Sequence, residues 1–161
     1  MSKKDTHQIT VGSKVYLTDP CYEPGTWCQS VETVKPGRWN CQVLYTKDDI
    51  YVRKLIVRHE DHPRAKMSLS PEIYDLGVDS GQFGVCDAEY YETANADEQS
   101  ARDFYAKVCS VTLSCNLPDS GTVADKGVFC SSGHGDGCYT ARVAKAYNQI
   151  VGFEIEFIYE R

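Results

Sequence analysis

The residues best suited to chemistry lie in one loop near the C-terminal end of the chain, at 129–139. The loop holds three glycines, two serines, a histidine and an aspartate, a composition that no hydrophobic core requires. Because glycine reaches positive φ without steric cost, Gly133, Gly135 and Gly137 indicate a backbone that bends sharply and repeatedly. Such a backbone can turn N–H groups toward an anion, whereas the Asp136 carboxylate and the serine hydroxyls are oxygen ligands for a cation. The sequence leaves the sign of the bound charge open.

Two further segments, 18–22 and 78–87, also place an aspartate where a strand meets a turn. Aspartates at turns commonly accept hydrogen bonds from nearby backbone N–H groups, so each one alone has a structural explanation. Taken together, the three segments favour a polar pocket with a glycine-lined floor at one end of a sheet. The predicted ligand-binding residues are Asp19, Asp79, Ser80, Gly81, Asp87, Ser132, Gly133, His134, Gly135, Asp136, Gly137 and Tyr139.

The first functional hypothesis is a binding domain for a small polar ligand. If the carboxylates of Asp19, Asp79 and Asp136 converge, they would favour Ca²⁺ or Mg²⁺, since both are hard cations that take oxygen ligands. If the glycine N–H groups converge instead, a nucleotide-like anion or another phosphate or carboxylate is favoured. The spacing of an EF-hand calcium loop is absent.

The second hypothesis is a small hydrolase. Cys21 or Ser132 would be the nucleophile and His134 the general base. Asp136 or Asp79 would orient the imidazole, and glycine N–H groups would stabilise an oxyanion. The Gly-x-Ser-x-Gly motif of a nucleophile elbow is missing, so the sequence favours binding over catalysis.

The third hypothesis is a protein-interaction or inhibitor domain in which the Gly/Asp turns are structural. Its binding surface would be an exposed aromatic patch drawn from the 11 tyrosines of the chain. Tyrosine is enriched at protein interfaces, although pairing within a sheet explains many tyrosines.

Charge and hydropathy narrow the partners and the location. The 17 basic and 23 acidic residues give a net charge of -6, which supplies no basic stripe for a phosphate backbone and argues against direct nucleic-acid binding. No segment approaches the ~18 consecutive apolar residues of a membrane span, and the first residues do not resemble a secretory signal. We therefore expect a cytoplasmic protein that does not bind membranes.

The eight cysteines are expected to be free thiols. They are scattered, no Cys-x-x-Cys pair occurs, and no pair of close ligands indicates a zinc site. Burial as small apolar side chains explains them best. Their positions are Cys21, Cys28, Cys41, Cys86, Cys109, Cys115, Cys130 and Cys138.

Apolar and aromatic residues recur at every second position of the regular stretches, which is the period of a β-strand. The turn at 46–49 predicts a β-hairpin, and helical spacing of apolar residues predicts one helix over 97–108, with Asn95 and Glu98 as a capping box. We expect a mainly β protein, α+β at most: an antiparallel β-sandwich or partly open barrel forming a single compact domain, 1–161, with an exposed connection at 59–71. The first predicted strands end at Asp19. The later predicted strands cover 39–45, 50–57, 110–115, 128–130, 139–143 and 150–159.

Several of these segments resemble the domain of unknown function 4241 family, which comprises uncharacterised proteins of bacteria and phages. The resemblance spans most of the chain and implies a β-rich fold without a defined activity. It also implies a bacterial or phage protein, in the host cytoplasm if phage-encoded, for which host–phage conflict is a plausible setting. Where the family often has an aromatic residue between the glycines, this chain has His134, so the resemblance assigns that residue no role. The matching segments are Asp19-Pro20, Pro36-Gly37-Arg38-Trp39, Val78-Asp79-Ser80-Gly81, Cys86-Asp87 and Ser132-Gly133-His134-Gly135-Asp136-Gly137-Cys138-Tyr139.

Overall fold

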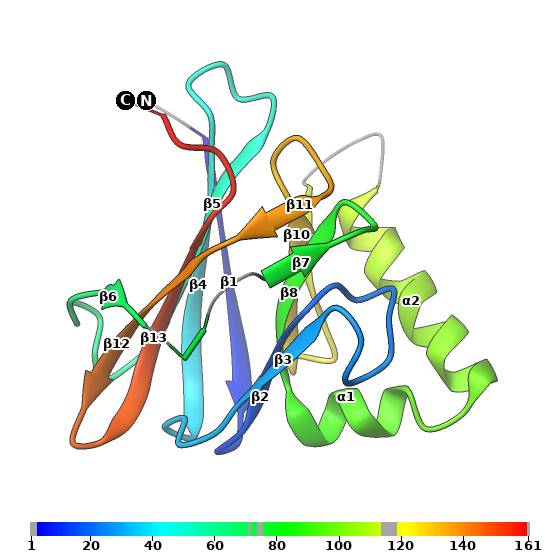
Figure 1. The fold of residues 1–161 in the computed structure, drawn as a ribbon, viewed down its shortest axis with the longest axis horizontal. Coiled ribbons are helices and arrows are strands. Elements are labelled where there is room, and N and C mark those ends of the chain that lie inside the picture. Colours follow the sequence, from blue (N-terminus) through cyan, green and yellow to red (C-terminus); the bar gives the residue numbers. More distant parts are fainter. Residues whose placement is uncertain (1–2, 71, 74–75, 114–118, 161) are drawn as a thin grey trace.

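Antiparallel β-sheets and two helices make up the fold of the computed structural model, which describes residues 3–70, 72–73, 76–113 and 119–160 (Figure 1). The prediction of a mainly β, sandwich-like α+β fold is confirmed. None of the described helices is long and apolar enough to cross a membrane.

The larger sheet has six strands and contains the predicted hairpin. Along β4 the side chains alternate between buried and more exposed positions, so Trp39, Cys41, Val43 and Tyr45 face the core. β4 pairs antiparallel with β5, as the sequence predicts for 39–45 and 50–57. The strand order is β1 (Lys4–Val11), β4 (Gly37–Tyr45), β5 (Val52–His59), β13 (Gln149–Glu156), β12 (Ala141–Ala146) and β6 (Ser68–Leu69).

The second sheet has five strands, and its inner face packs against the first sheet. Phe83 from β8 and Phe153 from β13 belong to the same buried cluster, which joins the two sheets. A short third sheet pairs β11 (Gly137–Tyr139) with β7 (Leu76–Val78). The order of the five-stranded sheet is β3 (Cys28–Val31), β2 (Val15–Thr18), β8 (Gln82–Asp87), β10 (Gly127–Ser131) and β9 (Ser120–Val123).

Both helices, α1 (Ala88–Ala94) and α2 (Glu98–Thr112), cover the outer face of the five-stranded sheet (Figure 1). Tyr91 of α1, Phe104 of α2 and Phe129 of β10 pack in one cluster there. The predicted helix over 97–108 is confirmed and extends further, but the prediction of one helix is wrong, because α1 also forms where Ala88 and Tyr91 are buried against the sheet. The predicted strand over 110–115 is wrong as far as Leu113, because Thr112 continues the buried face of α2; residues 114 and 115 lie outside the described part of the chain.

The helix cap differs from prediction, whereas the connection at 59–71 is exposed over most of its described residues, as predicted. Asp97, rather than Asn95, caps α2 by accepting a hydrogen bond from the Ser100 N–H at 2.8 Å, whereas Asn95 ends α1. The segment 59–71 contains β6, and its first residue, His59, is buried at the end of β5. Position 71 lies outside the described residues.

The cysteines follow the sequence prediction where the structure describes them. All seven described cysteines are free thiols. Cys41, Cys86 and Cys130 are buried, and burial raises the pKa of each of these thiols well above its ordinary value. Cys115 lies outside the described residues.

Candidate functional site

Asp19 forms the junction between two of the three predicted segments. It follows the end of β2, and its side chain is fully buried. Its Oδ1 accepts hydrogen bonds from the Cys21 N–H at 3.0 Å and from the Ser80 hydroxyl at 2.6 Å. Its Oδ2 accepts from the N–H groups of Asp79 and Ser80, both at 2.8 Å. The Asp19 carboxylate therefore links the turn that follows β2 to the turn at 79–80 through hydrogen bonds.

The glycine-rich loop is attached to the same junction. The Ser132 N–H donates to the carbonyl of Gly81 at 3.0 Å, and the Ser132 hydroxyl donates to the carbonyl of Gly135 at 2.9 Å. Pairing of Gly137 with Val78 then leads the chain on into β11. The loops 19–27, 79–81 and 132–138 consequently lie side by side, and we call them the rim (Figure 1).

Asp87 is not part of the rim, contrary to the sequence prediction. It lies at the opposite end of β8, where it accepts hydrogen bonds from the Gly12 N–H at 2.7 Å and the Tyr90 N–H at 3.2 Å. It is therefore the N-cap of α1. The physical reason is that the two ends of a strand lie at opposite edges of a sheet, so one motif cannot supply both ends to one site.

The carboxylates do not fit a Ca²⁺ or Mg²⁺ site. Both oxygens of Asp19 already accept hydrogen bonds from protein donors, and Asp79 accepts one from the Tyr22 hydroxyl. Asp136 lies exposed on its loop. In the part of the chain that the structure describes, no three His, Cys, Asp or Glu side chains are grouped so as to hold a metal ion.

The candidate catalytic residues do not form a triad. Burial raises the pKa of the Cys21 thiol, and the nearby charges of Asp19 and Asp79 add to the effect, so a thiolate nucleophile is disfavoured. The Ser132 hydroxyl is buried and bonded to its own loop. The His134 ring lies instead against Tyr51, with ring centroids 4.5 Å apart.

The exposed side chains of the rim include an aromatic pair that the sequence motifs do not single out. Trp27 is 44% exposed, and its ring centroid lies 6.1 Å from that of Tyr22. A Cβ atom at Gly77 would lie 2.3 Å from the Trp27 ring, so the glycine allows the indole to lie on β7. The hydrogen bond from the Tyr22 hydroxyl to Asp79 raises the pKa of Tyr22 to about 12. The only trace in the sequence of this packing of Trp27 is the glycine at position 77, which has no side chain to block the indole.

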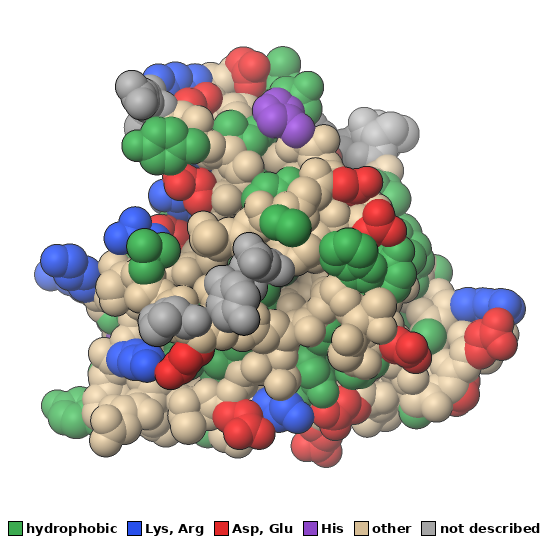
Figure 2. Space-filling view, viewed as in Figure 1, with side chains coloured by type: hydrophobic (Ala, Val, Ile, Leu, Met, Phe, Trp, Pro, Cys, Tyr) green, Lys and Arg blue, Asp and Glu red, His purple; other side chains and the backbone are tan. Residues whose placement is uncertain are grey.

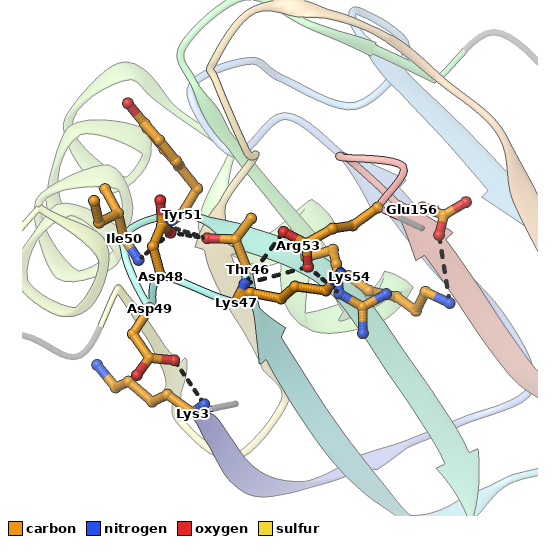
Figure 3. A network of polar contacts seen from close by, with 11 residues as sticks. Lys3, Thr46, Lys47, Asp48, Asp49, Ile50, Tyr51, Arg53, Lys54 and Glu156 are labelled. Carbon is orange, nitrogen blue, oxygen red and sulfur yellow. Dashed lines mark hydrogen bonds and ion pairs between the residues drawn. The ribbon is translucent and has the colours of Figure 1, made fainter. Parts of the chain in front are cut away.

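The turn between β4 and β5, residues 46–51, continues the exposed surface beyond the rim, and we call it the hairpin tip. The Asp48 carboxylate accepts hydrogen bonds from the Thr46 hydroxyl at 2.6 Å and the Ile50 N–H at 3.1 Å, and the first of these lowers the pKa of Asp48 (Figure 3). Ile50 and Tyr51 point away from the strands and are 60% and 40% exposed (Figure 3). The Tyr51–His134 contact joins the tip to the rim.

The charge on the rim has one sign. Its three loops contain the acidic residues Asp19, Glu23, Asp79 and Asp136 but no Lys or Arg. In the view of Figure 2, acidic and hydrophobic side chains intermingle over this side of the molecule, and Lys and Arg lie toward its margins.

Two cavities flank the aromatic pair. One of about 500 Å³ lies beside Trp27 and is lined in part by Gln29, Glu72 and Phe83. Another of about 470 Å³ lies beside Tyr22 and is lined in part by Glu23 and Asp97. Each ring of the aromatic pair thus lines one partly acidic depression.

Comparison with known proteins adds no relative: no family model, no curated protein and no solved structure matches the chain. The resemblance to the domain of unknown function 4241 family therefore stays a prediction, and the function has to be argued from the site.

Proposed function

We propose that this protein is a protein-recognition domain that binds a partner protein through the rim and the hairpin tip. The observation that carries the proposal is a set of exposed aromatic and aliphatic side chains held on a hydrogen-bonded frame. Trp27, Ile50 and Tyr51 are 44%, 60% and 40% exposed. Tryptophan and tyrosine are the residues most enriched among those that dominate binding energy at protein interfaces.

The frame under these side chains favours binding without a large ordering cost. Asp19 links the loops 19–27 and 79–81 by hydrogen bonds, and Ser132 links the loop 132–138 to Gly81. A hydrogen bond between the Thr46 hydroxyl and the Asp48 carboxylate stabilises the hairpin tip. A surface whose loops are already fixed loses little conformational entropy when a partner docks, which favours affinity.

The other two hypotheses have less support from the geometry. A small ligand held by converging carboxylates would need Asp19, which is fully buried and already accepts hydrogen bonds from the protein through both of its oxygens. A hydrolase would need Ser132 or Cys21 hydrogen-bonded to His134, whereas the Ser132 hydroxyl bonds to the Gly135 carbonyl and the His134 ring packs against Tyr51. The domain would instead act by occupying a surface of its partner, as an inhibitor or adaptor does. A cytoplasmic setting in host–phage conflict, implied by the family resemblance, accommodates that role.

The test is affinity capture from an extract of the producing cells, with variants that separate the proposed surface from the rest of the molecule. We expect one protein to be retained by the parent chain and lost with Trp27→Ala and with Tyr51→Ala. Tyr147→Ala is the matched control, because Tyr147 is 93% exposed and lies in the turn between β12 and β13. Equal capture by all four chains, or loss in the Tyr147 variant alone, would overturn the proposal.

A further inference from the structure

We infer that the rim takes an arginine side chain of the partner against Trp27 and Tyr22, so that the partner presents an arginine-containing basic segment. The inference rests on the proposed function and specifies the chemistry of its partner. It is carried by the aromatic pair, the adjoining groove and the one-signed charge of the rim.

The aromatic pair provides the platform. The planes of the Trp27 and Tyr22 rings are inclined at 48°, and Gly77 lies against the indole. Exposed faces of Trp and Tyr attract cations through the ring quadrupole, and the planar guanidinium of arginine also stacks on them. The groove of about 500 Å³ beside Trp27 leaves room for the side chain that carries the guanidinium.

The carboxylates of the rim and of the adjoining groove supply negatively charged hydrogen-bond acceptors, which suit a guanidinium cation. The Tyr22 hydroxyl donates to Oδ2 of Asp79, and Oδ1 of that carboxylate accepts no hydrogen bond from the described residues. Glu72 lines the groove, and Glu23 and Asp136 are exposed on the rim loops. A guanidinium has five N–H donors and pairs with carboxylates in a two-pronged geometry that a lysine ammonium lacks.

The backbone conformation at Trp27 determines where its ring lies. Its φ is 51°, a left-handed conformation that is a true outlier for a bulky residue. This conformation places an exposed indole on Gly77 beside the acidic groups.

Tryptophan fluorescence makes the inference directly measurable. The chain has two tryptophans, and Trp39 is only 2% exposed, so a bound cation would alter the emission of Trp27. We expect a hexa-arginine peptide to produce a saturable change that weakens as salt is raised, because exposed charge pairs are screened. The peptide with citrulline in place of arginine, which is similar in shape but neutral, should produce none. Hexa-lysine should bind about fivefold more weakly, since it stacks poorly.

Variants separate this contact from general attraction to an acidic protein. Asp79→Asn should weaken hexa-arginine binding by about fivefold or more, whereas Asp103→Asn, which removes an exposed carboxylate of α2, should leave it unchanged. Equal binding of the citrulline peptide, or an equal effect of the two variants, would overturn the inference. If hexa-arginine fails to bind while capture of the partner still depends on Trp27, the arginine inference is wrong and the proposed function stands. If capture does not depend on Trp27, both fail.

Discussion

Asp19 shows how a residue with the chemistry of a ligand can serve the fold instead. Its buried carboxylate accepts four hydrogen bonds, three of them from backbone N–H groups. Residue type and position at a turn identify Asp19 correctly as important, but they do not distinguish an acceptor for the protein from an acceptor for a ligand. That distinction depends on burial, which is set by the strands around it.

The first prediction concerns this carboxylate. Asp19→Ala leaves three backbone N–H groups without their acceptor, so the free energy of unfolding should fall by about 3 kcal/mol or more. Asp136→Ala, at an exposed position of the rim, should change it by less than about 0.5 kcal/mol. Urea denaturation of the two variants measures both values. Similar stability of the two proteins would show that Asp19 does not hold the junction.

The second prediction concerns Tyr22, whose pKa is raised to about 12 first by its hydrogen bond to Asp79. The raised pKa means that the folded protein favours the neutral phenol. The stabilisation is therefore complete below pH 10.0, the ordinary pKa of tyrosine, and is lost as the pH rises toward about 12. Asp79→Asn should move the pKa of Tyr22 back toward its ordinary value.

Ultraviolet titration of tyrosinate checks this shift, with Tyr22→Phe subtracted to isolate the residue. A titration of Tyr22 that is the same with and without the Asp79 carboxylate would contradict the assigned cause. The loss of stability between pH 10.0 and about 12 should also become shallower in the Tyr22→Phe variant.

At the scale of elements, the sequence predicts long regular segments well and short ones poorly. The alternation along β4 and over the second half of β13, the hairpin turn before β5 and the helical spacing in α2 suffice to locate those elements. α1 has only seven residues, too few for a clear helical period, and β6, β7 and β11 have two or three residues each. These short elements exist because their neighbours bury or pair with them, which no local pattern records.

The third prediction concerns the contact between β8 and β10 beneath α2. A Cβ atom at Gly84 would lie 2.2 Å from the Phe129 ring and 2.6 Å from the Val128 carbonyl oxygen. The backbone oxygen cannot move aside cheaply, so Gly84→Ala should lower the free energy of unfolding by about 2 kcal/mol. Thermal and urea denaturation measure the change.

Gly12→Ala is the control for this substitution, because its added Cβ would meet nothing closer than 3.4 Å. The Gly12 N–H, which bonds to Asp87, is retained in alanine. Equal effects at positions 12 and 84 would show that the crowding at Gly84 is not what limits the packing of Phe129.

At the scale of the whole molecule, the sequence anticipates part of the site. The junction of Asp19 with Asp79 and Ser80 joins two of the three predicted segments, and Ser132 brings in the third. The sequence prediction places Asp87 at the wrong edge of the sheet and does not single out Trp27. Trp27 depends on Gly77, a residue 50 positions away, and such a contact follows from strand order, which the sequence alone does not reveal.

The separation of the rim loops along the chain has a consequence for how the protein forms. Asp19 and Ser80 are 61 positions apart, and Gly81 and Ser132, which hydrogen-bond to each other, lie on rim loops from different parts of the chain. Contacts of such long range form slowly, because the intervening chain must first be brought together. The rim therefore comes into being only when the strands have assembled, and a nascent or partly unfolded chain would have no surface to offer the partner.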